Sequence, residues 1–356
     1  MKNKGLSMLE QGIHASTGCS AGGLPEGDPL IEDFITFKAQ NQGRSQRTAE
    51  AYRDALLRLN AFLGGRSLLE AHADELELFT GPFLHKAGVL AVARRPYIAS
   101  IREFYKWAAA RKMIANNPAA GLHYPKTGRK LPRSMSLQSA ESLMWAPNFN
   151  TFKGVRDAAI LAVLVGCGLR VGGLVALNES QLVQVSHEGE IRTIIRANEK
   201  GEKERMIPVP READMLLRLY LEHPELNEID RTLPDGDRVL FVSLVNRNVP
   251  PHLYIGEERR MAARSIRDMI QAYGAAAGID AAQLHPHAMR HLFGTELAED
   301  DVDLLVRQDL MGHGDAKSTR IYTHLAARKK IKTVDSSGPL AKIKTPVSEL
   351  LSRLQR

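Results

Sequence analysis

The stretch His285-Pro286-His287-Ala288-Met289-Arg290-His291 places three histidines and one arginine within seven residues. Packing alone does not require so many titratable side chains, so we expect this stretch to handle a polar or charged ligand. A metal site is one alternative, because His287 and His291 lie one helical turn apart. No Glu lies between these two histidines and no third acidic or cysteine ligand is near them, which disfavours a metal.

Two more polar motifs follow downstream, at residues 310–314 (LMGHG) and 318–324 (STRIYTH). They place His313 and Tyr322 nine positions apart. Taken singly, His313 is compatible with a helix cap and Tyr322 with a half-buried aromatic side chain. Only the order of all the motifs along the chain favours a functional interpretation over these structural ones.

Five short motifs stand in a defined order. They are Gly166-Cys167-Gly168-Leu169-Arg170, Lys200-Gly201 in an expected β-turn, His287-Ala288-Met289-Arg290-His291, Leu310-Met311-Gly312-His313 and Ile321-Tyr322-Thr323-His324. Together they closely resemble the tyrosine recombinase (phage integrase) family, over about residues 29–325. Upstream, residues 48–52 (TAEAY), 104–107 (FYKW) and 117–119 (NPA) are similar to that family's helical core-binding domain.

The resemblance implies a fold that is mainly α with a small β-sheet. An N-terminal helical core-binding (SAM-like) domain would precede a C-terminal α+β tyrosine recombinase catalytic domain. The implied activity is that of a site-specific recombinase, a DNA strand transferase that works through a 3′-phosphotyrosyl intermediate. It would need no metal, ATP or other cofactor, and integration, excision and resolution of DNA elements all stay open as outcomes.

Transesterification at a phosphodiester needs a nucleophile, a group that neutralises charge in the transition state, and a proton for the leaving 5′ oxygen. By resemblance Tyr322 is the nucleophile. Arg170 and Arg290 match the two arginines that clamp the phosphate, where a planar guanidinium fits better than an ammonium group.

The remaining catalytic positions follow from the same resemblance. His313 matches a donor to a non-bridging oxygen, and His287 matches the group that exchanges a proton with the tyrosine. Lys200 matches the general acid for the leaving 5′ oxygen, and Lys203 is a lower-ranked alternative. One position departs from the family pattern, since Gly173 stands where a carboxylate usually follows the first arginine, and a brace behind Arg170 is then missing.

Composition and periodicity divide the chain into five segments. We expect a flexible leader at 1–27, a helical core-binding domain at 28–123, a basic linker at 124–135, a catalytic domain at 136–326 and a tail at 327–356 with a short amphipathic helix. The linker has four positive charges among prolines and a glycine.

Periodicity also predicts individual elements. Single helices are expected at 68–84 and 96–111, and a hairpin of two strands at 191–197 and 205–209. Past Leu325 we expect a lysine-rich, irregular spacer up to Thr345.

The formal charge of +7 and the sequence pI of about 9.3 favour a polyanionic partner. We expect the two domains to form a C-shaped clamp around double-stranded DNA. Candidate phosphate contacts, any of which is alternatively only solvated surface, are Arg94, Arg95, Arg102, Lys106 and Arg111 on one helix and Lys126, Arg129 and Lys130 in the linker.

Only Cys19 and Cys167 are present, in dissimilar surroundings, which disfavours a disulfide framework or a cysteine metal site. No signal-like or membrane-spanning apolar run occurs. We therefore expect a cytoplasmic, nucleoid-associated protein of prokaryotic or phage origin.

The resemblance also implies partners and rivals. A homotetramer would assemble on two DNA recombination sites, an accessory protein is possible, and residues 345–354 resemble a segment exchanged between subunits. The alternative is that this segment folds back onto its own domain. Rival functions are a related type IB topoisomerase, disfavoured by the core-binding domain, and a DNA-binding regulator that has lost cleavage.

Overall fold

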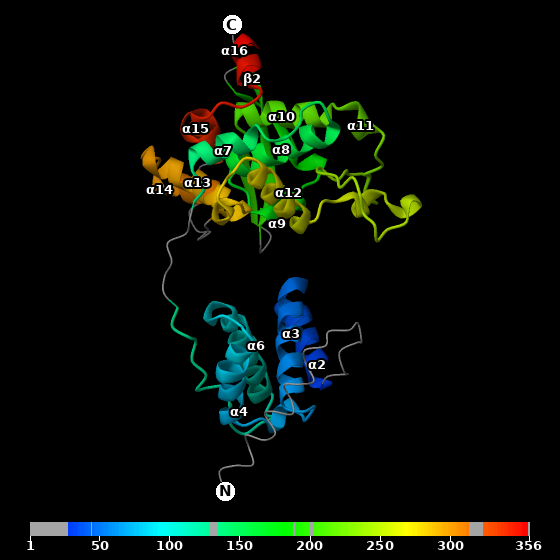
Figure 1. Ribbon diagram of the computed structural model, residues 1–356, viewed down its shortest axis with the longest axis vertical. Coiled ribbons are helices and arrows are strands. Elements are labelled where there is room, and N and C mark those ends of the chain that lie inside the picture. Colours follow the sequence, from blue (N-terminus) through cyan, green and yellow to red (C-terminus); the bar gives the residue numbers. More distant parts are fainter. Residues whose placement is uncertain are drawn as a thin grey trace. The chain divides into compact units, whose positions relative to one another are not determined.

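The computed structural model describes residues 28–43, 45–127, 134–187, 189–199, 203–312 and 323–354. The chain forms two compact units, residues 1–130 and residues 131–356 (Figure 1). Lys200, His313, Tyr322, Arg129 and Lys130 lie outside the described residues.

The described part of the first unit is helical. Its elements are α2 (Leu30–Gln42), α3 (Gln46–Phe62), the 3-10 turn η1 (Leu68–Glu70), α4 (Ala73–Leu78), the π turn η2 (Phe79–Phe83), α5 (Leu84–Lys86) and α6 (Ala91–Ala110). Large apolar side chains from α2, α3 and α6 make its core, among them Phe34, Leu56 and Phe104, which are fully buried. Burial of each such side chain stabilises the fold by about 1.5–3 kcal/mol.

The helix predicted at 68–84 is wrong as a single element. The carboxylate of Asp28 accepts hydrogen bonds from the Leu68 amide (2.7 Å) and the Ser67 hydroxyl (3.0 Å), which turns the chain at that point. The backbone is then extended at His72, and Pro82 lies within the π turn. These tertiary and local constraints divide the predicted helix into several short elements.

The second unit is helical around a small sheet. Its helices and strands are α7 (Leu137–Met144), α8 (Phe152–Cys167), α9 (Val171–Val175), β1 (Leu182–His187), β2 (Glu190–Glu199), β3 (Lys203–Pro208), α10 (Arg211–Leu221), α11 (Pro224–Asn227), α12 (Ala263–Ala276), α13 (Pro286–Glu299), α14 (Leu304–Met311), α15 (Thr323–Ser337) and α16 (Ser348–Leu354). Short 3-10 turns lie at Glu179–Gln181, Pro251–Leu253, Gly256–Arg259, Ala281–Gln283 and Pro339–Lys342.

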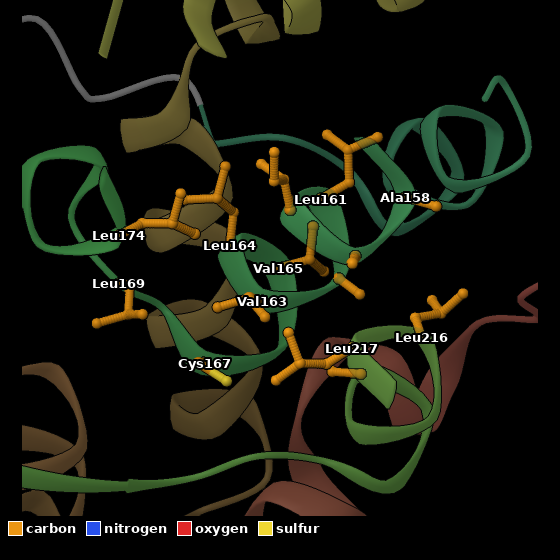
Figure 2. Packing of buried hydrophobic residues seen from close by; sticks show 14 of the residues in the cluster. Ala158, Leu161, Val163, Leu164, Val165, Cys167, Leu169, Leu174, Leu216 and Leu217 are labelled. Carbon is orange, nitrogen blue, oxygen red and sulfur yellow. The ribbon is translucent and has the colours of Figure 1, made fainter. Parts of the chain in front are cut away.

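Helix α8 is the centre of this unit. The Thr151 side chain caps its start by accepting a hydrogen bond from the Gly154 amide (3.1 Å), and Gly168 ends it in the left-handed conformation. Nearly all its side chains are buried, as expected from an apolar sequence all round. Figure 2 shows several of the apolar ones, among them Leu161 and Leu164, in one cluster with Leu174 of α9 and Leu216 of α10.

The sheet has three antiparallel strands in the order β1-β2-β3. Ile195 of β2 pairs with Leu182 of β1 and with Ile207 of β3. The sequence predicted β2 and β3 but missed β1. The reason is that β1 reads LVQVSH, a short run with one polar interruption, and its strand character depends on pairing with β2.

The lysine-rich segment after Leu325 is a helix, not the irregular spacer that was expected. Helix α15 is anchored in the unit by Ile331 and Val334, which are buried. Beyond it, Leu340, Ile343 and Val347 enter the main core. Residues 329–344 are therefore packed on their own unit and do not form a free linker. Few apolar residues mark this segment, so its periodicity was too weak to read.

Candidate active site

Three of the six predicted catalytic residues lie in the described chain. Arg170 directly precedes α9, at its N-terminal end, and His287 and Arg290 lie in the first turns of α13. The structure brings these two elements together at the end of α8.

The approach of the two elements depends on Gly168. Its φ of 58° lies in the left-handed region, which favours glycine. A Cβ atom at this position would come within 2.4 Å of the Phe293 ring on α13. After this turn Leu169 points into the core and Arg170 is exposed. Gly168 therefore places Arg170 beside α13.

Arg290 is buried at the centre of the site, with only 2% of its surface exposed. Its Nη1 donates to the carbonyl oxygen of Gly168 (2.5 Å), two residues before Arg170. Its Nη2 donates to the carbonyl oxygen of Met311, the last residue of α14. One guanidinium thus joins the ends of α8 and α14 to α13.

His287 is exposed, and its ring lies 4.8 Å from the ring of His291, centroid to centroid. Partial burial lowers the pKa of His287, and the positive charges of His291, Arg290, His285 and Arg170 lower it further. Both candidate arginines therefore add positive potential at this histidine. A neutral imidazole can accept a proton.

The lowered pKa predicts how His287 titrates. In the free protein its midpoint should lie below about 6.5, because protonation would add positive charge beside two arginines. Cleavage that depends on neutral His287 should then lose rate only as the pH falls through that lowered value. NMR titration of histidine-labelled protein, with His287→Gln for assignment, measures the midpoint, and a value at or above 6.5 would contradict the prediction.

His285 and His291 were not named as site residues, and the structure separates their roles. The Nδ1 atom of His285 accepts a hydrogen bond from the Ala288 amide (2.9 Å), so His285 caps α13. His291 contacts His287 and lines an open pocket of about 390 Å³ with Gly294, Thr295 and Met311. The i, i+4 spacing of His287 and His291 was the sequence signal for this contact.

Both ends of the segment 313–322 are attached to the same framework. On the N-terminal side, Arg205 of β3 donates to the Leu310 carbonyl (2.7 Å). On the C-terminal side, Asp335 of α15 makes a two-pronged ion pair with buried Arg192 of β2 (2.5 and 2.8 Å). Lys330 of α15 also pairs with Asp309 of α14. These contacts hold the chain on both sides of His313 and Tyr322.

Residues 200–202 connect strand β2, which ends at Glu199, to strand β3, which begins at Lys203. The pairing of the two strands runs from Ile194 opposite Pro208 to Glu199 opposite Lys203. The predicted general acid Lys200 thus belongs to the connection of a described antiparallel pair, and Lys203 is the first residue of β3.

The predicted phosphate contacts on α6 and directly after it differ in their surroundings. Arg94 donates to the Gly81 carbonyl (3.2 Å), and Arg111 lies over the rings of Phe37 (4.7 Å) and Trp107 (5.0 Å). Both guanidiniums therefore have partners within the helical unit, although Arg111 is exposed.

Arg95, Arg102 and Lys106 are exposed and share one face of α6, since they recur at i, i+7 and i+11. The guanidiniums of Arg95 and Arg102 lie 4.9 Å and 5.7 Å from the ring of Tyr124, at the start of the linker, and Arg102 also donates to the Leu122 carbonyl (3.3 Å). Lys126, two residues further, is also exposed. We call Arg95, Arg102 and Lys106 the α6 basic stripe.

Some cations elsewhere in this unit have carboxylate partners. Carboxylates pair with Arg53 (Glu32, 2.7 Å), Arg58 (Asp54, 3.1 Å) and Lys38 (Glu103, 2.6 Å). Within the described residues, the α6 basic stripe has no such ion pair. Its positive charge is thus uncompensated.

Two further findings concern only the described ranges. No three His, Cys, Asp or Glu side chains there are grouped so as to hold a metal ion. None of the helices there combines the length and apolar character needed to span a bilayer.

Two family profiles match the chain. That of the phage integrase family matches residues 133–329, and that of the phage integrase N-terminal SAM-like domain matches residues 31–112. Tyrosine recombinase XerD of Proteus mirabilis is 33% identical over 308 residues, which span 85% of this chain and 91% of that protein.

Solved structures share the fold. XerH site-specific recombinase, bound to difH substrate in a pre-cleavage complex, matches with a TM-score of 0.58 and 18% identity, over 85% of this chain and 95% of that one. A lambda integrase tetramer bound to a Holliday junction matches with a TM-score of 0.56 and 14% identity, over 88% of this chain and 87% of that one.

Proposed function

Because this chain belongs to the phage integrase family and is thus a site-specific tyrosine recombinase that cleaves and rejoins DNA strands, we propose that Tyr322 attacks a phosphate held by Arg170 and Arg290. The observation that carries this assignment is the hydrogen bond from Arg290 to the Gly168 carbonyl. It places the Arg290 guanidinium on the backbone two residues before Arg170, so that both arginines belong to one corner of the unit and can bind one phosphate.

In the proposed reaction the Tyr322 oxygen forms a bond to phosphorus while the bond from phosphorus to the 5′ oxygen breaks. His287, which its lowered pKa keeps in the neutral form, accepts the tyrosine proton, and Lys200 gives a proton to the 5′ oxygen. His313 donates to a non-bridging oxygen. The resulting 3′-phosphotyrosyl ester keeps the energy of the broken bond, so another strand's 5′-hydroxyl reverses the step without ATP.

The α6 basic stripe is the proposed phosphate-binding face of the helical unit. Its charges extend over about 16 Å of helix, which matches several phosphates along a DNA strand. The Tyr124 ring holds Arg95 and Arg102 near each other by cation–π contact. Lys126, Arg129 and Lys130 would continue this contact along the linker.

Removing two charges from the stripe tests this assignment. The double substitution Arg95→Ala and Arg102→Ala should lower the slope of log affinity against log salt concentration by about two, since each phosphate contact contributes about one. Fluorescence anisotropy of labelled duplex DNA at several salt concentrations measures the slope. Arg53→Ala is the matched control, because Arg53 pairs with Glu32 and should leave the slope unchanged. Equal losses in both variants would contradict the assignment.

We also propose that four copies assemble on two DNA sites and exchange only the part of α16 that follows Ser348. The chain up to Ser348, the first residue of α16, is held on its own unit, where Thr345 is buried and the Ser348 hydroxyl donates to Glu212 (2.7 Å). In α16 itself Leu350 is 46% exposed. An exchanged segment therefore begins after Ser348, not at Thr345.

A truncation of the C-terminal residues distinguishes exchange of this segment between subunits from packing of the segment on its own subunit. Removal of residues 349–356 should prevent stable pairing of two DNA sites while binding to a single site stays unchanged, because the buried part of the tail is kept. Gel-shift assays resolve the one-site and two-site complexes. Unaltered pairing by the truncated protein would show that α16 serves its own subunit.

One experiment tests the proposed function as a whole. A duplex selected for binding from a random-sequence pool is nicked near its centre, so that the cleaved fragment diffuses away and the covalent complex is trapped. We expect an adduct resistant to denaturation, with the DNA attached to the peptide that contains Tyr322. Two intact copies of the same duplex should then exchange strands. Relaxation of supercoiled DNA without exchange would instead indicate a topoisomerase, and binding without an adduct a regulator.

A further inference from the structure

Helix α9 carries Arg170 at its N-terminal end, and its own sequence disfavours a stable helix. It has only five residues, and Gly172 and Gly173 are adjacent within it. Glycine is the poorest helix former after proline. A Cβ atom at Gly172 would meet nothing within 4 Å, and one at Gly173 would meet only a methyl group of Leu169, at 3.9 Å. Close packing therefore does not explain either glycine.

Arg260 binds the opposite end of this helix. Its Nη1 donates to the carbonyl oxygens of Val175 (3.0 Å) and Leu177 (3.1 Å), and its Nη2 donates to Oδ1 of Asn178 (2.7 Å). Val175 is the last residue of α9, where carbonyl groups lack partners within a helix. One guanidinium thus satisfies the free end of α9 and the chain that follows it.

Arg260 is itself fixed in place. Its side chain is 17% exposed, and both oxygens of Glu257 accept hydrogen bonds from it (2.7 and 2.8 Å). Its backbone bridges to Val242, and the next amide, that of Met261, donates to the Phe241 carbonyl (3.2 Å). These bonds tie the guanidinium to the body of the second unit.

We propose that Arg260 is a positioning residue that holds α9, and through it Arg170, in place of the brace that Gly173 does not provide. The two residues act at opposite ends of one short helix, so loosening the C-terminal end frees the N-terminal end. The inference rests on the proposed role of Arg170 as a phosphate clamp. A displaced clamp loses transition-state contacts while most DNA contacts persist.

The alternative is that Arg260 only stabilises the unit. Arg231 provides a matched control for that alternative. It is also a buried arginine, it donates to the carbonyl of Val239 (2.9 Å) and pairs with Glu179 (2.8 Å). None of these contacts reaches α9, so Arg231 stabilises the same region without holding Arg170.

The test compares cleavage rates of full-length variants on the nicked duplex defined above, with DNA in excess. Arg260→Met, which keeps the aliphatic stem and removes every donor, should slow adduct formation about ten-fold while DNA affinity changes less than about two-fold. Adding Gly172→Ala and Gly173→Ala should recover about five-fold of that loss, because alanine strengthens α9 from within. Arg231→Met should cleave at nearly the wild-type rate, and the alanines should not change it.

Each other outcome has a defined meaning. Equal rates for Arg260→Met and wild type, an equal loss in Arg231→Met, or no recovery with the alanines would overturn the positioning role. If Arg260→Met unfolds at the assay temperature, Arg260→Lys carries the same comparison, since one ammonium cannot reach all three acceptors. Failure of the wild-type protein to form any adduct would instead remove the proposed function.

Discussion

Replacing Tyr322 with phenylalanine is expected to abolish the covalent protein–DNA adduct and all strand exchange, with DNA affinity changed by less than about two-fold. Phenylalanine keeps the ring but lacks the oxygen that bonds to phosphorus. Denaturing electrophoresis of the nicked duplex detects the adduct, and gel shift under native conditions measures the affinity.

Tyr254→Phe is a suitable control for this experiment. The Tyr254 hydroxyl lies in the same unit and donates to the Ser243 carbonyl (2.7 Å), which belongs to neither α9 nor α13. This variant should form the adduct as the wild-type protein does. An adduct formed by Tyr322→Phe would place the nucleophile elsewhere and remove the central assignment.

Replacing Arg290 with lysine should slow cleavage by about a thousand-fold. It should also lower the free energy of unfolding by about 2 kcal/mol, because a buried carbonyl loses its donor. The guanidinium reaches Gly168 and Met311 on two sides, whereas a single ammonium group reaches one of them. Lysine keeps the charge, so the loss isolates the effect of the fork geometry. Single-turnover cleavage and denaturant unfolding measure the two effects.

Arg156→Lys separates stability from catalysis in that comparison. Arg156 is also buried, and it donates to the Val242 carbonyl (2.8 Å) and to Asp157 (2.9 and 2.6 Å), with no contact to the site. This variant should lose stability but keep its cleavage rate below its unfolding temperature. Comparable cleavage by Arg290→Lys and the wild-type protein would exclude Arg290 as a phosphate clamp.

Local sequence patterns predicted strands β2 and β3 of the second unit, and helix α8 carries equally local signals. Helix α8 has a capping threonine, an apolar body and a terminal glycine, and each of these acts within a few residues. Strand β1 and helix α15 were missed for the opposite reason. Strand β1 depends on its pairing with β2. Helix α15 depends on two ion pairs, Lys330 with Asp309 and Asp335 with Arg192. The partners lie more than 20 and more than 140 residues earlier in the chain.

The sequence by itself determined the family and the mainly helical fold, and it predicted the side chains for the proposed chemistry, because residue types at ordered spacings are visible in it. Only the tertiary structure decided how the arginines are used. Arg290 binds Gly168 and Met311, and Arg260 binds Val175 and Leu177, through backbone carbonyls. Every residue has such a carbonyl, so these partners leave no mark in the sequence and appear only when the chain is folded.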